Sequence, residues 1–268
     1  MKKMTFWLVA LILVIAIIPG MITGCKNTPA EPTEQEEETG MKYVAHRGYS
    51  HSYVGNTEEA FKAAAVKGFY GIETDIRKTK DGYFVCNHDA SVKYADGSEK
   101  KISATKRDAL LSLPLENDKT DTPAYLCTFE KYLQACKNGN KVAVIELKDW
   151  FDENDVQEIL SIIDAEYDRK NVTFISFMLL PLLYVKEADP SIPLQYLSQT
   201  ENDQTFARCL QEKISIDVKY TILTSDLVKQ FHDAGLKVNV WTVDDRSVLQ
   251  TVTALGVDFV TTDVFCEY

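Results

Sequence analysis

The sequence predicts an α/β chain folded as a (β/α)8 barrel, or TIM barrel. Apolar, β-rich runs alternate with helical patterns nearly to the end of residues 41–268, and eight of these runs have the length of strands. This alternation is typical of a parallel sheet covered by helices, and eight such units make one barrel. A flavodoxin-like doubly wound sheet is the alternative. The predicted strands are 43–46, 70–76, 142–147, 172–176, 193–197, 213–217, 236–241 and 257–261.

Helical patterns lie between most of the predicted strands. Thr57 followed by Glu58 and Glu59 is typical of a helix start, because acidic side chains are favourable near the positive end of a helix dipole. Gly235 and Gly256 lie where helices are expected to end before a strand. Helices are predicted at 57–67, 154–165, 178–188, 224–234 and 245–255.

One apolar run, at 83–87, breaks the alternation. It follows the strand at 70–76 too closely to be the next barrel strand, because a parallel crossover needs about a dozen residues. An Asp-Gly pair between two β-rich runs indicates a hairpin. We therefore predict a hairpin excursion over 77–88, which folds His88 back toward the second strand. Segment 90–140, with helical pieces near 104–111 and 128–137, then leads to the third strand.

The N-terminal segment 1–25 is predicted to be a targeting signal. Its apolar run at 6–18 is shorter than the roughly 20 residues that span a bilayer, and it fits a secretory signal peptide. Small residues then precede Cys25, which resembles the lipobox of bacterial lipoproteins and implies cleavage before Cys25 and acylation of its thiol. A plain signal peptide or membrane anchor is the alternative.

Residues 26–40 are rich in Pro, Glu and Thr and contain no large apolar side chain, so we predict a flexible tether without a core. The expected protein is thus extracytoplasmic, attached to the bacterial cell membrane through a lipid on Cys25, with its catalytic domain at 41–268. The full chain has 29 basic and 40 acidic residues and a formal net charge of −11. Such a chain has no broad positive surface for nucleic acid.

The chain has six cysteines, and those beyond Cys25 match no CxxC or zinc spacing. We predict buried free thiols, with one disulfide as the alternative. These cysteines are Cys86, Cys127, Cys136, Cys209 and Cys266.

Three carboxylates predict a metal site. Glu73 and Asp75 project to the same side of the second strand, where two like charges are unfavourable unless a cation or proton lies between them. Glu146 lies in the apolar third strand, where a carboxylate needs a partner. Because strand ends form the mouth of a barrel, these side chains are expected to bind one divalent cation, Mg²⁺ or Ca²⁺. Salt bridges from Glu73 and Asp75 to Arg77 or Lys78 are the alternative.

Two histidines are candidate catalysts. His46 ends the first strand and His88 ends the hairpin, and each is followed by a charged residue. Histidine changes its protonation near neutral pH, so the pair could supply one base and one acid. His51 is expected on the surface, and His232 has no partner motif.

These fragments, in this order, resemble the glycerophosphodiester phosphodiesterase family over 43–263. Each fragment is common singly, whereas their order and spacing are specific. The fragments are His46-Arg47-Gly48, Asn56-Thr57, Glu73-Thr74-Asp75, His88-Asp89, Glu146-Leu147-Lys148, Trp241-Thr242 and Thr262-Asp263.

The resemblance implies a TIM-barrel hydrolase that releases sn-glycerol 3-phosphate and an alcohol from small glycerophosphodiesters. It also implies that Glu73, Asp75 and Glu146 bind the cation and that His46 and His88 are the acid–base pair, which we assign as base and acid respectively. Arg47 and Lys148 would contact the phosphate, and the nucleophile is water or the substrate's own 2-hydroxyl. Trp241 is expected to form an apolar wall against glycerol carbons, with barrel packing as the alternative.

Gly55 departs from the family pattern, because the family usually has Glu before the Asn-Thr pair, and metal affinity or substrate choice could differ as a result. Val264 also replaces the family's usual Pro. The rival functions are a phospholipase-D-like lyase that stops at a cyclic phosphate, a tethered lipoprotein that binds glycerophosphodiesters without turnover, and a scaffold without chemistry.

Overall fold

The chain folds into a closed barrel of parallel strands. This computed structural model describes residues 41–201 and 203–264, and within them the barrel order is β1-β12-β11-β10-β9-β8-β7-β2. Because β1 pairs with both β12 and β2, the sheet closes, which confirms the TIM-barrel prediction and excludes an open doubly wound sheet. The barrel strands are β1 (Lys42–Ala45), β2 (Gly71–Lys78), β7 (Val142–Leu147), β8 (Val172–Ser176), β9 (Leu194–Ser198), β10 (Ser215–Lys219), β11 (Val238–Trp241) and β12 (Phe259–Thr262).

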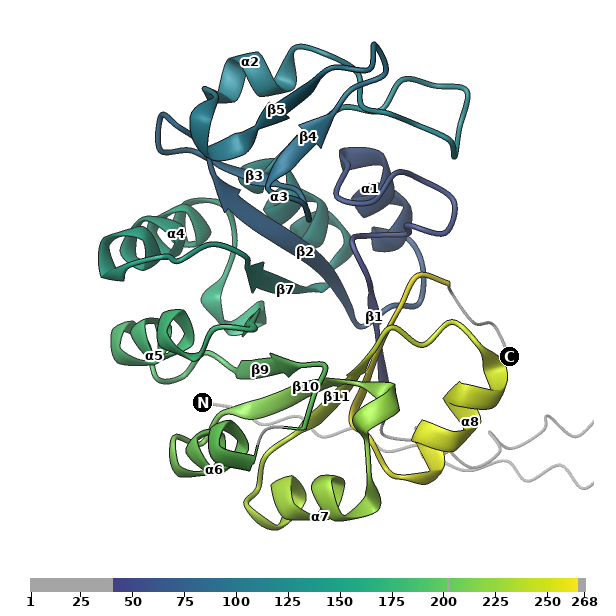
Figure 1. Cartoon of the computed structure of the whole chain (residues 1–268), viewed down its shortest axis with the longest axis vertical. Helices are drawn as coiled ribbons and strands as arrows, with labels where there is room; N and C mark the ends of the chain where they lie inside the picture. Colours follow the sequence, from purple (N-terminus) through teal and green to yellow (C-terminus); the bar gives the residue numbers. More distant parts are fainter. Residues whose placement is uncertain (1–40, 202, 265–268) are drawn as a thin grey trace, which may run out of the picture. The chain divides into compact units, whose positions relative to one another are not determined.

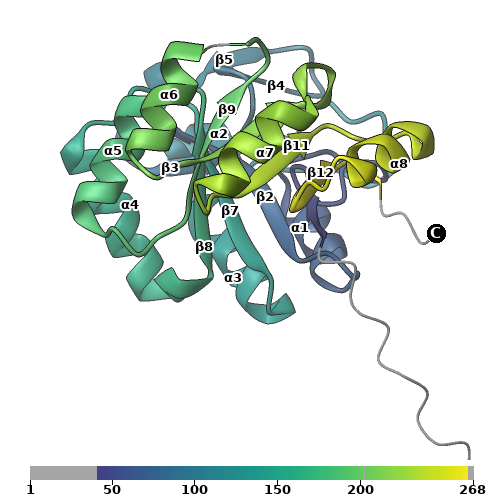
Figure 2. The same ribbon diagram turned by 90° about the horizontal axis from the view of Figure 1, so that it is seen from below.

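Helices surround the barrel (Figures 1 and 2). The predicted start of the first helix is confirmed, because the Thr57 hydroxyl accepts a hydrogen bond from the Ala60 N–H at 3.3 Å. The helices around the barrel are α1 (Glu58–Ala65), α3 (Phe129–Gly139), α4 (Glu153–Glu166), α5 (Leu179–Ala188), α6 (Asp203–Gln211), α7 (Ser225–Asp233) and α8 (Arg246–Ala254).

Helix α6 was not among the predicted helices. Its buried apolar residues, Phe206 and Cys209, are three positions apart, which is a helical spacing that the prediction left unassigned in this short and mostly polar segment. The strand that follows was predicted at 213–217 but occupies Ser215–Lys219. Lys213 adopts a left-handed backbone with φ 54°, which delays the start of the strand.

The excursion after β2 is confirmed as an antiparallel hairpin. Strand β3 (Phe84–Cys86) pairs with the end of β2, with Cys86 opposite Ile76. Figure 1 shows β4, β5 and α2 together beyond β3. The pairing of β4 with β5 was not predicted, because these short strands are largely charged or exposed. The remaining elements of the excursion are β4 (Ser91–Lys93), β5 (Glu99–Lys101), α2 (Arg107–Leu111) and β6 (Cys127–Thr128).

The main apolar core lies between the barrel and its helices. A second apolar cluster contains Val144 and Ile175, which precede the catalytic mouth on neighbouring strands. Because strand residues alternate between faces, Val144 and Glu146 share one face of β7. Along β7 the side chains on this face therefore change from apolar Val144 to acidic Glu146.

The cysteines in the described part of the chain are buried and free, as predicted: Cys86, Cys127, Cys136 and Cys209. Across 41–201 and 203–264, none of the helices combines the length and the apolar character needed to cross a membrane. The predicted signal segment 1–25, its lipobox Cys25, the tether 26–40 and Cys266 lie outside the described residues.

Candidate active site

The predicted site residues gather at the carboxyl ends of the barrel strands, around a cavity of about 300 Å³. The cavity brings together the side chains that were predicted from separate motifs. Asp75 does not line the cavity directly but belongs to its acidic cluster. The predicted residues that line the cavity are His46, Arg47, Glu73, His88, Glu146, Lys148 and Trp241.

Three buried carboxylates form the acidic cluster. Glu73, Asp75 and Glu146 each present one oxygen within 4.8 Å of the others. Their proximity follows from strand register, because Asp75 lies opposite Glu146 in the parallel pair of β2 and β7. Carboxylate oxygens at these positions suit a hard divalent cation, and the donor set contains no sulfur or imidazole that would favour zinc.

The alternative prediction, salt bridges from Glu73 and Asp75 to Arg77 or Lys78, is wrong. Arg77 donates to Asp149 at 2.6 Å, and Lys78 pairs with Asp155 and, at 3.5 Å, with Glu158. Neither of these basic side chains therefore neutralises Glu73 or Asp75.

The pKa values within the cluster are pushed apart. Burial and the neighbouring Asp75 and Glu146 charges raise the pKa of Glu73 well above its usual range. Burial and Asp75 also raise the pKa of Glu146 to about 7, against the opposing effect of Lys148. Burial likewise acts to raise the pKa of Asp75, but Arg47 and Lys148 outweigh it and lower that pKa to about 2. Carboxyl groups with raised pKa values are stabilised in their charged form by a bound cation.

Asn56 orients the central carboxylate. Its Nδ2 donates to Asp75 Oδ2 at 2.8 Å, while its Oδ1 accepts from the Thr74 hydroxyl at 2.7 Å. Asn56 adopts a left-handed backbone with φ 60°, which asparagine tolerates better than most residues. The Asn-Thr pair of the sequence motif thus combines an orienting group for Asp75 with the cap of α1.

The turn after β1 is shaped by Gly48. Gly48 has φ 80°, and a Cβ at this position would lie 2.6 Å from the Ala60 carbonyl carbon. Glycine is therefore needed for the turn to pack on α1. This turn directs the Arg47 N–H to Glu73 Oε2 at 2.8 Å.

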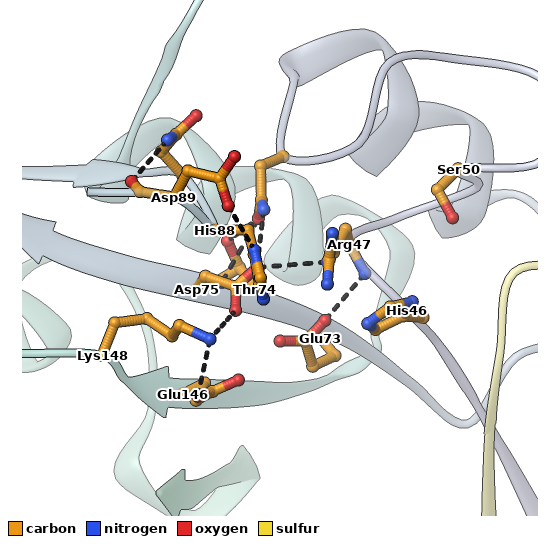
Figure 3. Close-up of polar contacts among 12 residues, drawn as sticks. His46, Arg47, Ser50, Glu73, Thr74, Asp75, His88, Asp89, Glu146 and Lys148 are labelled. Atoms are coloured by element: carbon orange, nitrogen blue, oxygen red, sulfur yellow. Dashed lines mark hydrogen bonds and ion pairs between the residues drawn. The ribbon is translucent and has the colours of Figure 1, made fainter. Parts of the chain in front are cut away.

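Two positively charged side chains, Lys148 and Arg47, lie beside the acidic cluster (Figure 3). Lys148 Nζ is 3.0 Å from Glu146 Oε1 and 3.4 Å from Asp75 Oδ1. Arg47 Nε is 3.4 Å from Asp75 Oδ2, yet it is buried without a hydrogen-bond partner in the described chain. The Arg47 guanidinium therefore retains donor capacity toward a bound anion.

Each predicted catalytic histidine is bonded through Nδ1 to a carboxylate. His46 Nδ1 lies 2.7 Å from Asp263 Oδ1, and His88 Nδ1 lies 2.8 Å from Asp89 Oδ1. A carboxylate at Nδ1 favours the tautomer with its proton there, so Nε2 is the nitrogen left for chemistry. Ser50 also donates to Asp263 Oδ1 at 2.7 Å.

The other histidines lie apart from this pair. His51 is exposed, as predicted. His232 Nε2 lies 2.8 Å from Asp258 Oδ2, a partner that the sequence did not indicate.

Within the predicted catalytic pair, burial, followed by the charge of Arg47, lowers the pKa of His88.

An aromatic corner forms another part of the cavity wall. The rings of Trp241 and Phe177 meet edge to face at 5.7 Å between centroids, and both side chains line the cavity. Trp241 Nε1 donates to the Asp217 carbonyl at 3.2 Å. Trp241 is thus both anchored to the barrel and presented to the cavity, which joins the two roles weighed from the sequence.

Sequence reasoning did not assign site roles to Asn56, Asp263 or Asp217. The first two were noted only as parts of motifs, because their partners are distant in the chain. Asp217 carried a usable signal, since it is an acidic residue on an apolar strand, as Glu146 is. Asp217 is 1% exposed and lines the cavity.

Comparison with known proteins agrees with this geometry. The profile of the Glycerophosphoryl diester phosphodiesterase family matches residues 46–265. The glycerophosphodiester phosphodiesterase of Caldanaerobacter subterraneus subsp. tengcongensis is 27% identical over 225 residues, which cover 82% of this chain and 93% of that protein.

Solved structures share the fold. A glycerophosphodiester phosphodiesterase from Parabacteroides distasonis matches with a TM-score of 0.72 at 26% identity, covering 84% of this chain and 93% of that one. An Oleispira antarctica phosphodiesterase, solved with the product sn-glycerol-3-phosphate, matches with a TM-score of 0.75 at 20% identity, covering 83% and 92%.

The site combines a buried acidic triad, two histidines bonded to carboxylates and two basic side chains at the mouth of a (β/α)8 barrel. This combination is that of a hydrolase of phosphoric diesters. Fold alone would not establish this, since barrels support many reactions. The chain belongs to the glycerophosphoryl diester phosphodiesterase family, as the match over residues 46–265 shows. Its enzyme class is therefore that of the glycerophosphodiester phosphodiesterases.

Proposed function

We propose that this enzyme hydrolyses glycerophosphodiesters to sn-glycerol 3-phosphate and an alcohol, with one Mg²⁺ or Ca²⁺ held by Glu73, Asp75 and Glu146. The observation that carries the proposal is that oxygens of these three carboxylates lie within 4.8 Å of one another, and that Glu73 and Glu146 line the same cavity as His46 and His88. The product named for the similar Oleispira antarctica structure supports the assignment of sn-glycerol 3-phosphate.

The phosphate group is bound beside the acidic cluster. When bound, the cation polarises a phosphoryl oxygen and lowers the pKa of a coordinated hydroxyl or water. Arg47 offers a planar fork of donors to the other phosphoryl oxygens, and Lys148 offers a point charge. The Arg47 and Lys148 side chains lie within 3.4 Å of Asp75. A phosphate that contacts these two side chains is therefore also adjacent to the proposed metal site.

The two histidines move the protons. One Nε2 takes the proton of the nucleophile and the other gives a proton to the departing alcohol oxygen. His46 is assigned as the base and His88 as the acid. Asp263 and Asp89 hold the two rings through Nδ1 at 2.7 and 2.8 Å, so each ring turns its other nitrogen toward the reaction.

Product analysis tests the proposal. Purified enzyme is treated with EDTA and then supplied with Mg²⁺ or Ca²⁺, and sn-glycerol 3-phosphate release is measured on glycerophosphocholine, glycerophosphoethanolamine and glycerophosphoglycerol. We expect loss of activity with EDTA and recovery with a divalent cation. Accumulation of a cyclic phosphate in phosphorus NMR spectra would instead identify the lyase, and tight binding without turnover would identify a binding protein.

We also propose that the enzyme acts outside the cytoplasm, attached to the cell membrane through a lipid on Cys25. The support is the apolar run at 6–18 followed by small residues before Cys25. Labelling with radioactive palmitate in a bacterial host tests this proposal. Label that persists in Cys25→Ser would overturn it, and label in the wild type alone would support it.

A further inference from the structure

Asp217 is a buried carboxylate that the reaction described above does not use. It lies in the middle of β10, and its side chain is 1% exposed although it lines the cavity. Its Oδ1 is one of the few buried side-chain polar atoms in the described residues that have no hydrogen-bond partner. A buried oxygen without a partner is unfavourable, so it indicates a group that a ligand completes.

The surroundings of Asp217 hold it in place. Asn239 lies opposite Asp217 in the pair of β10 and β11, and Asn239 Nδ2 donates at 3.2 Å to Gln195 Oε1 and to Thr261 Oγ1. Trp241 Nε1 donates to the Asp217 carbonyl. The backbone of Asp217 is therefore anchored by Trp241, while its Oδ1 has no hydrogen-bond partner among the described residues.

Asp217 is separate from the acidic cluster. The cluster whose oxygens lie within 4.8 Å of one another contains Glu73, Asp75 and Glu146 but not Asp217. In the closed barrel, β10 is separated from β7 by β8 and β9, so Asp217 lies on a different part of the cavity wall from the cation site. Burial and the charge of Glu146 raise the pKa of Asp217 well above its usual range, and a hydroxyl can bond either form of the carboxyl group.

We propose that Asp217, outside the acidic cluster but on the same cavity, binds the terminal hydroxyl of the glycerol moiety and thereby selects fully deacylated substrates. This inference rests on the proposed function. A phosphate beside Lys148 and a glycerol chain against Trp241 place the far end of that chain along the wall that contains Asp217. An ester at this hydroxyl removes its donor and adds bulk, so a lysophospholipid is a poor substrate.

A matched pair of substrates tests this assignment. Glycerophosphocholine is compared with its analogue in which propane-1,2-diol replaces glycerol, which keeps the 2-hydroxyl but lacks the terminal one. Wild-type enzyme is expected to prefer the glycerol substrate roughly 10- to 100-fold in kcat/KM, because the analogue leaves Oδ1 unpaired. Asp217→Ala should lose most of that preference, whereas Asp217→Asn should keep part of it, because an amide also bonds a hydroxyl.

Binding of products gives a readout that does not need turnover. The dissociation constants of sn-glycerol 3-phosphate and propane-1,2-diol phosphate are measured by calorimetry in Mg²⁺ and again in Ca²⁺. If wild type favours the glycerol compound and Asp217→Ala does not, the inference holds even when no diester is hydrolysed, and only the proposed function fails. If wild type hydrolyses glycerophosphocholine but Asp217→Ala weakens both ligands equally, the inference fails and the proposed function stands.

Thermal unfolding separates binding from folding. Removal of an unpaired buried carboxyl beside Glu146 is expected to leave the melting temperature of the ligand-free enzyme unchanged or higher. A lower melting temperature in Asp217→Ala, with equal losses on both substrates, would show that Asp217 is structural and would overturn the inference.

Discussion

His46 and Asp263 stand 217 positions apart in the chain, and their side chains meet at 2.7 Å. His46 follows β1 and Asp263 follows β12, and these two strands pair in parallel at the point where the barrel closes. Closure of the barrel therefore creates the contact that orients His46, the proposed catalytic base. The same carboxylate accepts a hydrogen bond from Ser50.

Asp263→Asn is expected to lower kcat with little change in KM. An amide can donate to Nδ1 and so favour the wrong tautomer of His46, and loss of such an orienting carboxylate costs roughly 10- to 100-fold or more. Steady-state kinetics on glycerophosphocholine measure the effect. Ser50→Ala is the matched control, because it removes a bond to the same oxygen without touching His46, and its kcat should change little. Equal losses in both variants would contradict the role of Asp263.

A substrate with an activated leaving group can show which of the two histidines is the base and which is the acid. With glycerophosphocholine, His46→Ala and His88→Ala should each lose roughly 10²- to 10⁴-fold in kcat. With the 4-nitrophenyl diester of glycerol 3-phosphate, the leaving group needs no proton. His88→Ala should then recover most of its rate and His46→Ala should not. Recovery in His46→Ala instead would exchange the two roles, and near-wild-type turnover in either variant would exclude that residue from the chemistry.

Metal affinity should increase with pH. Protons compete with a cation for the oxygens of Glu73 and Glu146, because the pKa of Glu146 is raised to about 7 and that of Glu73 is raised well above its usual range. A cation must displace these protons. The rise in melting temperature on adding Mg²⁺ or Ca²⁺ should therefore grow from about pH 6 to about pH 8. A shift that is independent of pH would argue against the triad as the ligand set.

The stability of the metal-free enzyme should fall as pH rises, in contrast to its metal affinity. The folded state holds the Glu146 proton up to about pH 7, whereas the unfolded chain loses it near 4.5. Because the folded state binds more protons in this window, its stability falls as pH rises from 4.5 to about 7. Glu146→Gln should flatten this slope in thermal unfolding with EDTA present. An unchanged slope in that variant would show that Glu146 is not the titrating group.

Trp241 should act mainly on binding. Trp241→Ala removes the ring from the aromatic corner with Phe177, so we expect a higher KM for glycerophosphocholine. Trp241→Phe is the control, because it keeps an apolar ring but loses the bond from Nε1 to the Asp217 carbonyl. An unchanged KM in Trp241→Ala with a lower melting temperature would assign this residue to barrel packing alone.

The sequence by itself predicted the barrel and the acidic cluster of Glu73, Asp75 and Glu146. Alternation of strand and helix patterns predicted the eight units, and the spacing of Glu73 and Asp75 predicted that both face the same side, because these are local periodicities of the backbone. The Asp-Gly signal also placed the hairpin that returns His88. Helix α6 was not predicted because its segment is short and mostly polar, although Phe206 and Cys209 have a helical spacing.

Only the tertiary structure decided which distant side chains support these residues. Asn56 beneath Asp75 and Asp263 behind His46 depend on strand register and on side-chain rotamers, which no local pattern encodes. Salt bridges from Glu73 and Asp75 to Arg77 or Lys78 remained an alternative until the fold paired these two basic residues with Asp149 and Asp155. Neighbouring charges decided the protonation as well, because burial raises the pKa of both carboxyl groups, but Arg47 and Lys148 lower that of Asp75 to about 2, whereas that of Glu146 is raised to about 7.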